Sequence, residues 1–142
     1  MPSNIADYSI IFSGFSIVLI VILLLILFYF LTRQKSQQRK IIEAKLKYLD
    51  KLANSGELYQ LKSALMEADK VFDYALKMKK VKGETLGERL KNTKNLFKWV
   101  DYQNIWEAHK LRNKMAHEIE FTPTIKELNE KYAYLRAGIK KL

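Results

Sequence analysis

The hydrophobic residues of this chain form one continuous run near the N-terminus and several interrupted stripes after it. From Tyr8 to Thr32, 25 residues carry no charged side chain. The densest part, Ile10–Leu31, would form a helix about 33 Å long, which matches a hydrocarbon core about 30 Å thick. We therefore predict a single transmembrane helix over residues 8–32, preceded by a short tail at residues 1–7.

A cleaved signal peptide and a buried helix of a soluble domain are the alternatives for this run. A signal peptide carries basic residues before its apolar stretch and small residues after it. Here Asp7 precedes the run, and Leu31, Thr32 and Arg33 end it. A buried helix of a soluble protein seldom extends this far without a polar break. A membrane anchor explains the run best.

After position 33, apolar residues recur every three or four positions, which predicts helices. The expected helices cover residues 34–53, 55–80, 86–100 and 102–119, and a last one follows Thr124. Pairs of a polar residue with a glutamate three positions later predict helix starts, and Asp101 is expected to cap the fourth helix. These pairs are Asn54 with Glu57, Thr85 with Glu88, and Thr124 with Glu127. Asn54-Ser55-Gly56, Val81-Lys82-Gly83 and Phe121-Thr122-Pro123-Thr124 are expected to separate the helices.

The predicted fold class is therefore all-α. A single N-terminal transmembrane helix is followed by a basic juxtamembrane helix at residues 33–54. Residues 55–142 are then expected to form an up-and-down bundle of four to five helices with short loops. About 110 residues outside the membrane are enough for one modest hydrophobic core.

Composition and charge add an orientation. The chain has no cysteine, which excludes disulfides and thiolate chemistry and fits a reducing cytoplasm. Residues 33–142 hold all 25 basic and 14 acidic side chains, a net charge of +11. Six bases follow the apolar run closely: Arg33, Lys35, Arg39, Lys40, Lys45 and Lys47. The positive-inside rule then predicts a single-pass protein of the inner (plasma) membrane with its N-terminus outside. These bases can also contact anionic membrane lipid, although setting the topology is sufficient to explain them.

One stretch of the fourth predicted helix differs from a plain scaffold. It contains both histidines of the chain, His109 and His117. On a helix, His109, Arg112 and Asn113 stand at i, i+3 and i+4, and Asn113 and His117 stand at i and i+4. These four side chains form a polar ladder. Arg112 and His117 are five positions apart, or about 140° around a helix, so they meet only across an irregularity, a groove or a dimer interface.

The string Arg112-Asn113-Lys114-Met115-Ala116-His117 resembles the R-x4-H motif of the HEPN family. The resemblance implies an all-helical bundle with the motif on its penultimate helix, as expected here. It also implies a homodimer and, in many members, a metal-independent endoribonuclease that leaves a 2′,3′-cyclic phosphate. The N-terminal membrane anchor departs from typical members. Many HEPN proteins are non-catalytic, so the resemblance alone leaves activity open.

The residue types suit such a reaction. A neutral imidazole such as that of His117 can take the proton of the ribose 2′-hydroxyl. The planar guanidinium of Arg112 can bind phosphate oxygens. Asn113 would orient His117 or bind a phosphate oxygen, and His109 is an accessory candidate for proton transfer. We predict no cofactor and no metal site, because the two histidines are eight positions apart and no HExxH spacing occurs.

Other interpretations of the same residues remain open. The ladder can be a structural network or part of a dimer interface, which would make the chain a non-enzymatic, membrane-tethered scaffold for an unidentified protein partner. Trp99, Tyr102 and Trp106 can stack on RNA bases, although their spacing is more typical of a core or an interface. The basic charge can attract RNA or an anionic membrane.

Overall fold

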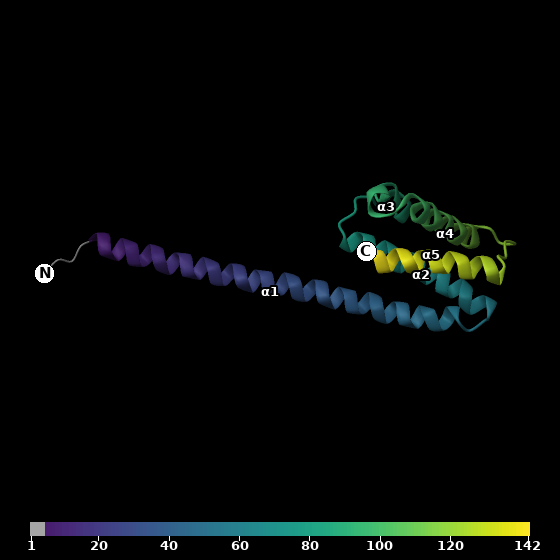
Figure 1. The fold of residues 1–142 in the computed structure, drawn as a ribbon, viewed down its shortest axis with the longest axis horizontal. Helices are drawn as coiled ribbons and strands as arrows, with labels where there is room; N and C mark the ends of the chain where they lie inside the picture. The colour runs from purple at the N-terminus through teal and green to yellow at the C-terminus, as the bar shows by residue number, and fades with distance from the viewer. Residues whose placement is uncertain (1–4) are drawn as a thin grey trace. The chain divides into compact units, whose positions relative to one another are not determined.

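The computed structural model describes residues 5–142, with side chains from Gly14 onward. Residues 1–4 of the expected N-terminal tail therefore lie outside the described residues. The chain forms two units, which meet between Ile41 and Ile42. Throughout the described residues the regular structure is helical, in agreement with the predicted all-α class. Figure 1 shows the long helix α1 (Ile5–Ala53), which belongs to both units.

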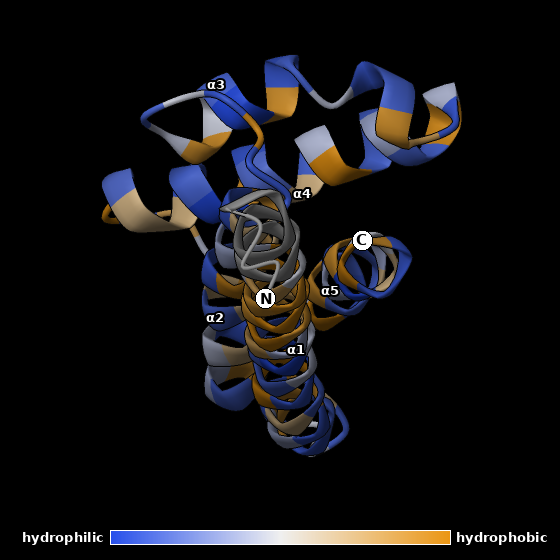
Figure 2. Ribbon diagram, turned by 90° about the vertical axis from the view of Figure 1, so that its left-hand side faces the viewer, coloured by the Kyte–Doolittle hydropathy of each residue, from blue (hydrophilic) through white to orange (hydrophobic). Residues whose placement is uncertain are grey.

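The first unit is the N-terminal part of α1, and it contains one stretch long and apolar enough to cross a membrane. Its large apolar side chains from Phe15 to Leu31 are exposed, and they appear as the orange part of α1 in Figure 2. The hydroxyl of Thr32 donates to the carbonyl oxygens of Phe28 and Tyr29, so this polar residue is satisfied by its own helix.

The second unit, Ile42–Leu142, is the helical bundle. It contains the end of α1, α2 (Leu58–Met78), α3 (Leu86–Lys91), a short 3-10 helix η1 (Lys94–Leu96), α4 (Trp99–His117) and α5 (Ile125–Lys141). Helix α5 packs against both α2 and α4. The largest fully buried apolar side chains come from every α-helix of the bundle: Leu49, Leu61, Leu65, Phe72, Leu76, Leu90, Ile105, Leu128 and Leu135. The predicted stripes thus meet in one core.

At two of the three predicted capping boxes the threonine caps its helix as expected. The hydroxyl of Thr85 accepts a hydrogen bond from the backbone N–H of Glu88, and Thr124 accepts one from Glu127. Asn54 does not cap α2, because Glu57 occupies the N-cap position and Ser55 bonds to its N–H. Asp101 is not a cap either, because α4 begins at Trp99 and Asp101 lies within its first turn. The carboxylate of Asp101 instead accepts a hydrogen bond from Lys141 on α5.

The expected continuous helix over residues 86–100 is wrong. Helix α3 ends at Lys91, and the amide of Asn92 donates to the carbonyl oxygens of Lys82 and Glu88. The hydroxyl of buried Thr93 donates back to the carbonyl of Leu90. Short polar side chains of this kind compete with the helical backbone hydrogen bonds, so two of them in a row stop the helix.

Helix α2 ends earlier than Val81-Lys82-Gly83 predicts. Lys80 adopts a left-handed conformation with a φ of 57°. The backbone N–H groups of Lys80 and Val81 bond to the carbonyls of Lys77 and Leu76, which is the Schellman pattern of a helix end. Gly83, with a φ of 140°, is needed for another reason. A Cβ atom there would lie 2.6 Å from the backbone nitrogen of Arg89.

Asp50 joins the end of α1 to α5. Its carboxylate accepts hydrogen bonds from the guanidinium of Arg136 and, at 2.7 Å, from the hydroxyl of Tyr132. The hydrogen bond from Arg136 lowers the pKa of Asp50 below its usual 3.8; burial opposes this shift and the Tyr132 bond adds to it. The folded protein therefore holds the carboxylate ionised more strongly than the unfolded chain does.

This gives a pH-dependent prediction. Because the pKa of Asp50 is lower in the folded state, its contribution to stability is complete above pH 3.8 and is lost as the pH falls through the folded-state pKa. Asp50→Asn is expected to be less stable than the wild type at neutral pH, with the difference shrinking towards pH 3. Denaturant unfolding of both proteins over this pH range measures it. An equal difference at neutral and acid pH would contradict the prediction.

Candidate functional site

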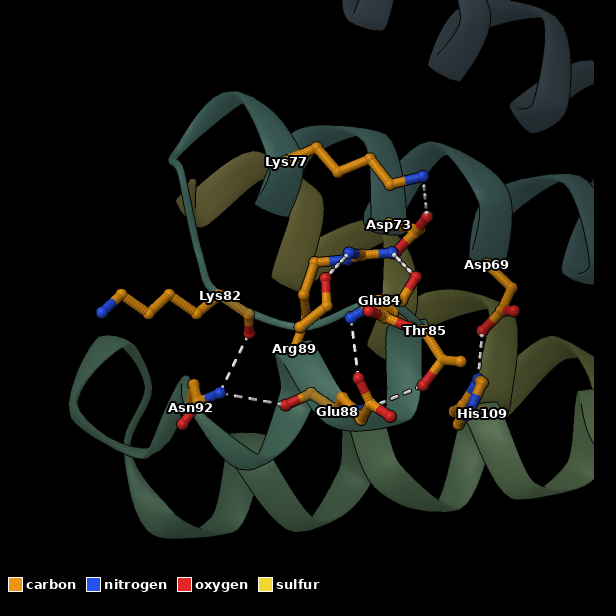
Figure 3. A network of polar contacts seen from close by, with 11 residues as sticks. Asp69, Asp73, Lys77, Lys82, Glu84, Thr85, Glu88, Arg89, Asn92 and His109 are labelled. Carbon is orange, nitrogen blue, oxygen red and sulfur yellow. Dashed lines mark hydrogen bonds and ion pairs between the residues drawn. The ribbon is translucent and has the colours of Figure 1, made fainter.

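Three of the four residues of the predicted ladder come together, and α2 supplies a fourth partner that the sequence analysis did not name. His109, Arg112 and Asn113 lie on one face of α4, opposite Asp69 of α2. The Nδ1 of His109 is 2.8 Å from Oδ1 of Asp69, and Nε of Arg112 is 3.3 Å from Oδ2 of the same carboxylate. Figure 3 shows the contact between Asp69 and His109.

These four side chains close a ring of polar contacts. Nη1 of Arg112 donates to Oδ1 of Asn113 at 3.1 Å, and Nδ2 of Asn113 lies 3.1 Å from Nε2 of His109. The donors and acceptors match when Asn113 donates to Nε2 and His109 donates from Nδ1 to Asp69. This tautomer is assigned from the hydrogen-bond pattern. In this arrangement the imidazole of His109 links the carboxylate of Asp69 to the amide of Asn113.

Both ends of the Asp69–His109 contact are buried. Asp69 is 4% exposed and His109 is 9% exposed, and α3 lies beside them. A Cβ atom at Gly87 would be 3.8 Å from Nε2 of His109 and 3.9 Å from the ring of Trp106. His109 is thus largely enclosed, and its expected accessory role in proton transfer stays a prediction.

Only part of the Arg112 guanidinium takes part in this ring of polar contacts. Its side chain is 24% exposed, and Nε is buried near Asp69 without a hydrogen bond of good geometry. Nη1 donates to Oδ1 of Asn113, and Nη2 makes no hydrogen bond or ion pair among the residues with described side chains. The guanidinium is therefore held by an ion-pair contact with Asp69 and a hydrogen bond to Asn113, and the N–H groups of Nη2 remain available to an anion.

His117 does not join the ring. It is the last residue of α4, its side chain is exposed, and it makes no hydrogen bond to Arg112. The intervening residues turn the helix by about 140°, as the ideal geometry requires. The two residues of the R-x4-H motif thus make no contact with each other in the described chain, and a dimer interface is one arrangement that could bring them together.

A second polar network holds the loop that leads into α3. The buried guanidinium of Arg89 donates to Asp73 at 2.7 Å and to the carbonyl oxygens of Gly83 and Glu84 (Figure 3). Burial alone would raise the pKa of Asp73, but hydrogen bonds from Arg89 and Lys77 outweigh it and lower this pKa. The network fixes α3 on α2 and so keeps α3 beside His109.

Asp69 could have been anticipated in part from the sequence. Asp69 and Asp73 are four positions apart, on the edge of the apolar stripe of α2. Acidic residues there end up buried and need cationic or donor partners. Which base each would meet depends on tertiary packing between helices distant in sequence, which no local pattern specifies.

The aromatic residues at the start of α4 are divided between the interior and the surface. Tyr102 is buried, and Trp106 is partly buried with its ring edge-on to those of Tyr102 and His109. Trp99 stacks on Tyr102 at 5.8 Å between ring centroids but remains 66% exposed. The expectation of core packing therefore holds for Tyr102 and Trp106, and Trp99 is left at the surface.

The resemblance to the HEPN family depends on Arg112, Asn113 and His117 and on their place in an all-helical chain. Among the residues with described side chains, no three acidic or histidine residues are grouped as a metal site would require. No protein-family model matches this sequence, and comparisons with curated proteins and with solved structures give no match either.

Proposed function

We propose that this chain is a membrane-anchored, HEPN-like protein that binds RNA and cleaves it without a metal ion, as a homodimer. The apolar run of α1 would anchor it in the inner membrane with the N-terminus outside and the bundle in the cytoplasm. Arg112, Asn113 and His117 would provide the chemistry, with Asp69 and His109 as positioning residues.

The observation that carries the proposal is the way Arg112 is held. Asp69 approaches its Nε edge and Asn113 accepts from Nη1, while Nη2 makes no hydrogen bond among the described residues and the side chain is 24% exposed. An arginine that serves only as a structural ion pair more commonly offers a carboxylate two parallel N–H groups. An oriented guanidinium with spare donors is suited to phosphate, and the basic charge of the bundle favours the approach of RNA.

The reaction would be a transesterification within the RNA. The imidazole of His117 takes the proton of a ribose 2′-hydroxyl, and the 2′-oxygen attacks the adjacent phosphorus. Arg112 stabilises the negative charge on the phosphorane oxygens. The 5′-oxygen of the next nucleotide leaves with a proton, which the partner subunit's His117 can supply. The products are a 2′,3′-cyclic phosphate and a free 5′-hydroxyl.

The test uses the full chain in lipid nanodiscs, incubated with structured and single-stranded RNA in the presence of a chelator. We expect cleavage, and we expect Arg112→Ala and His117→Ala each to slow it by roughly 10²-fold or more, the usual contribution of a proton-transfer group. Lys110→Ala is the matched control, because Lys110 is an exposed base on the same helix, paired only with Glu107. Circular dichroism checks that the variants are folded.

Equal cleavage by wild type and both variants would contradict the assignment of these residues. The absence of both cleavage and salt-dependent RNA binding would contradict the proposed function as a whole. Because Arg112→Ala also removes one of the two partners of Asp69, Arg112→Lys provides a second variant that retains the charge. We expect it to keep RNA binding and to lose most cleavage, since an ammonium lacks the planar fork.

The alternative is a non-enzymatic, membrane-tethered scaffold, and one observation favours it. The ring of Asp69, His109, Asn113 and Arg112 closes on itself without any ligand. Such a network can serve only to fix α2 against α4. In that case Arg112→Ala would lower stability, whereas the exposed His117 could be replaced without any effect on binding or folding.

A further inference from the structure

We call one end of the bundle the entry end, because α1 reaches the bundle from that side, at Ile42. Figure 1 shows α3 and the C-terminus at one end and the α1–α2 and α4–α5 turns at the other. Since α1 finishes at the α1–α2 turn, it enters the bundle from the side of α3, and Lys45 then pairs with Glu67 in the middle of α2. Two contacts agree: Arg89 of α3 binds Asp73 in the last part of α2, and Asp101 at the start of α4 binds Lys141 at the end of α5.

The entry end is strongly basic. The lysines that gather there are all exposed, and none of them makes an ion pair within residues 14–142. They are Lys79, Lys80, Lys82, Lys91, Lys94, Lys98 and Lys140. The nearby acids are largely engaged: Asp73 and Asp101 bind other bases, and Glu88 accepts the backbone N–H of Glu84. Glu84 adds one exposed carboxylate.

The same end exposes apolar side chains. In the segment from Lys91 to Val100 there is no acidic residue, and Leu96, Trp99 and Val100 are 46%, 66% and 66% exposed. Three lysines alternate with these groups. Isolated apolar residues at a surface need no explanation, but an exposed indole and two exposed aliphatic side chains in one segment with three exposed lysines make that segment amphipathic.

We propose that the entry end docks on anionic phospholipid headgroups, with Trp99, Leu96 and Val100 inserted at the interface. Lysines near a membrane are attracted to its acidic lipids, and tryptophan favours the headgroup level. This inference rests on the membrane anchor of the proposed function. Ten residues, 32–41, connect the apolar run to the bundle, about 15 Å as a helix, so an anchored chain keeps its bundle close to the bilayer.

RNA is the competing occupant, because it also attracts lysine and stacks on tryptophan. Leu96 and Val100 favour the membrane over RNA. Burial of their aliphatic side chains in the interfacial region is favourable, whereas such side chains neither stack on RNA bases nor bind phosphate. The polar ring also lies farther along α4, which leaves the candidate RNA site free when the entry end is docked.

The test uses the full chain in vesicles of phosphatidylcholine, with or without an equal amount of phosphatidylglycerol, whose acyl chains carry bromine. Bromine quenches a nearby indole. In a Trp106→Phe background, where Trp99 is the remaining tryptophan, we expect quenching that is stronger with the anionic lipid and weakens in high salt. Lys94→Gln/Lys98→Gln should lower the docking equilibrium by about fivefold per lysine.

Lys51→Gln/Lys126→Gln is the matched control, since both lysines are exposed, belong to the other end of the bundle and remove the same charge. In the Trp99→Phe variant the remaining indole fluorescence comes from Trp106, and brominated lipid should quench it little. Flotation of the vesicles separates the two proposals. A chain that does not float lacks the anchor. If the chain floats but brominated lipid does not quench Trp99, the docking is overturned. The docking is also overturned if only added RNA, and not lipid, changes the fluorescence of Trp99.

Discussion

Replacing Asp69 by alanine is expected to lower the free energy of unfolding of the bundle by about 3 kcal/mol. Asp69 is buried, and its two carboxylate oxygens face His109 and Arg112. Without it, the buried Nε of Arg112 loses its anionic neighbour and the Nδ1 of His109 loses its acceptor. A charge left buried without a partner is more costly than the loss of an exposed pair.

Denaturant unfolding of the full chain, followed by tryptophan fluorescence, measures this effect. Trp106 is a suitable reporter because its ring lies against that of His109. Asp69→Asn retains an acceptor for His109 and should fall between the wild type and Asp69→Ala. Glu107→Ala serves as the control, since it removes only an exposed pair with Lys110 and should cost under about 1 kcal/mol. If the two alanine variants unfolded together, the ring would not stabilise the bundle.

Phe72→Ala should destabilise the bundle by about 3–5 kcal/mol, the range for removing a buried aromatic ring. Phe72 is fully buried on α2 and its ring lies 6.0 Å from that of Phe97. It also faces Gly138 of α5, where an added Cβ atom would lie 2.9 Å from Phe72 and 2.9 Å from Ile105. The close approach of α5 to α2 and α4 thus depends on a position without a side chain.

A double-mutant cycle tests this packing. Gly138→Ala alone should cost about 1–3 kcal/mol through overpacking. In the Phe72→Ala background the cost should be smaller, because the removed ring leaves space and Ile105 alone still restricts the new methyl group. The expected coupling is about 0.5 kcal/mol or more. Strictly additive effects in denaturant unfolding would show that Gly138 and Phe72 do not share one packing site.

The parts of the fold that the sequence could predict depend on local periodicity. The stripe of Leu128, Tyr132 and Leu135 faces the core as expected, and Thr85 and Thr124 cap the helices they were expected to cap. The interruption of the helix after Lys91 was missed, since Asn92 and Thr93 also occur within helices, and the bond from Asn92 to the carbonyl of Lys82 that helps to stop this helix forms only in the folded chain.

The candidate site was likewise predictable from the sequence only in part. The shared face of His109, Arg112 and Asn113 follows from positions i, i+3 and i+4 on one helix. Their common partner Asp69 is 40 residues from His109, and only the packing of α2 on α4 brings it there. The separation of Arg112 from His117 also follows from helix geometry. Whether a second copy reunites them is a property of the assembly, and this makes the reaction itself the decisive observation.

The most direct measurement is of the ends of the RNA fragments produced by the full chain in nanodiscs with a chelator present. Our account predicts fragments ending in a 2′,3′-cyclic phosphate and beginning with a 5′-hydroxyl, which disappear in the Arg112→Ala/His117→Ala double variant. Intact RNA after incubation with the folded wild type, or the same fragments from the double variant, would contradict it.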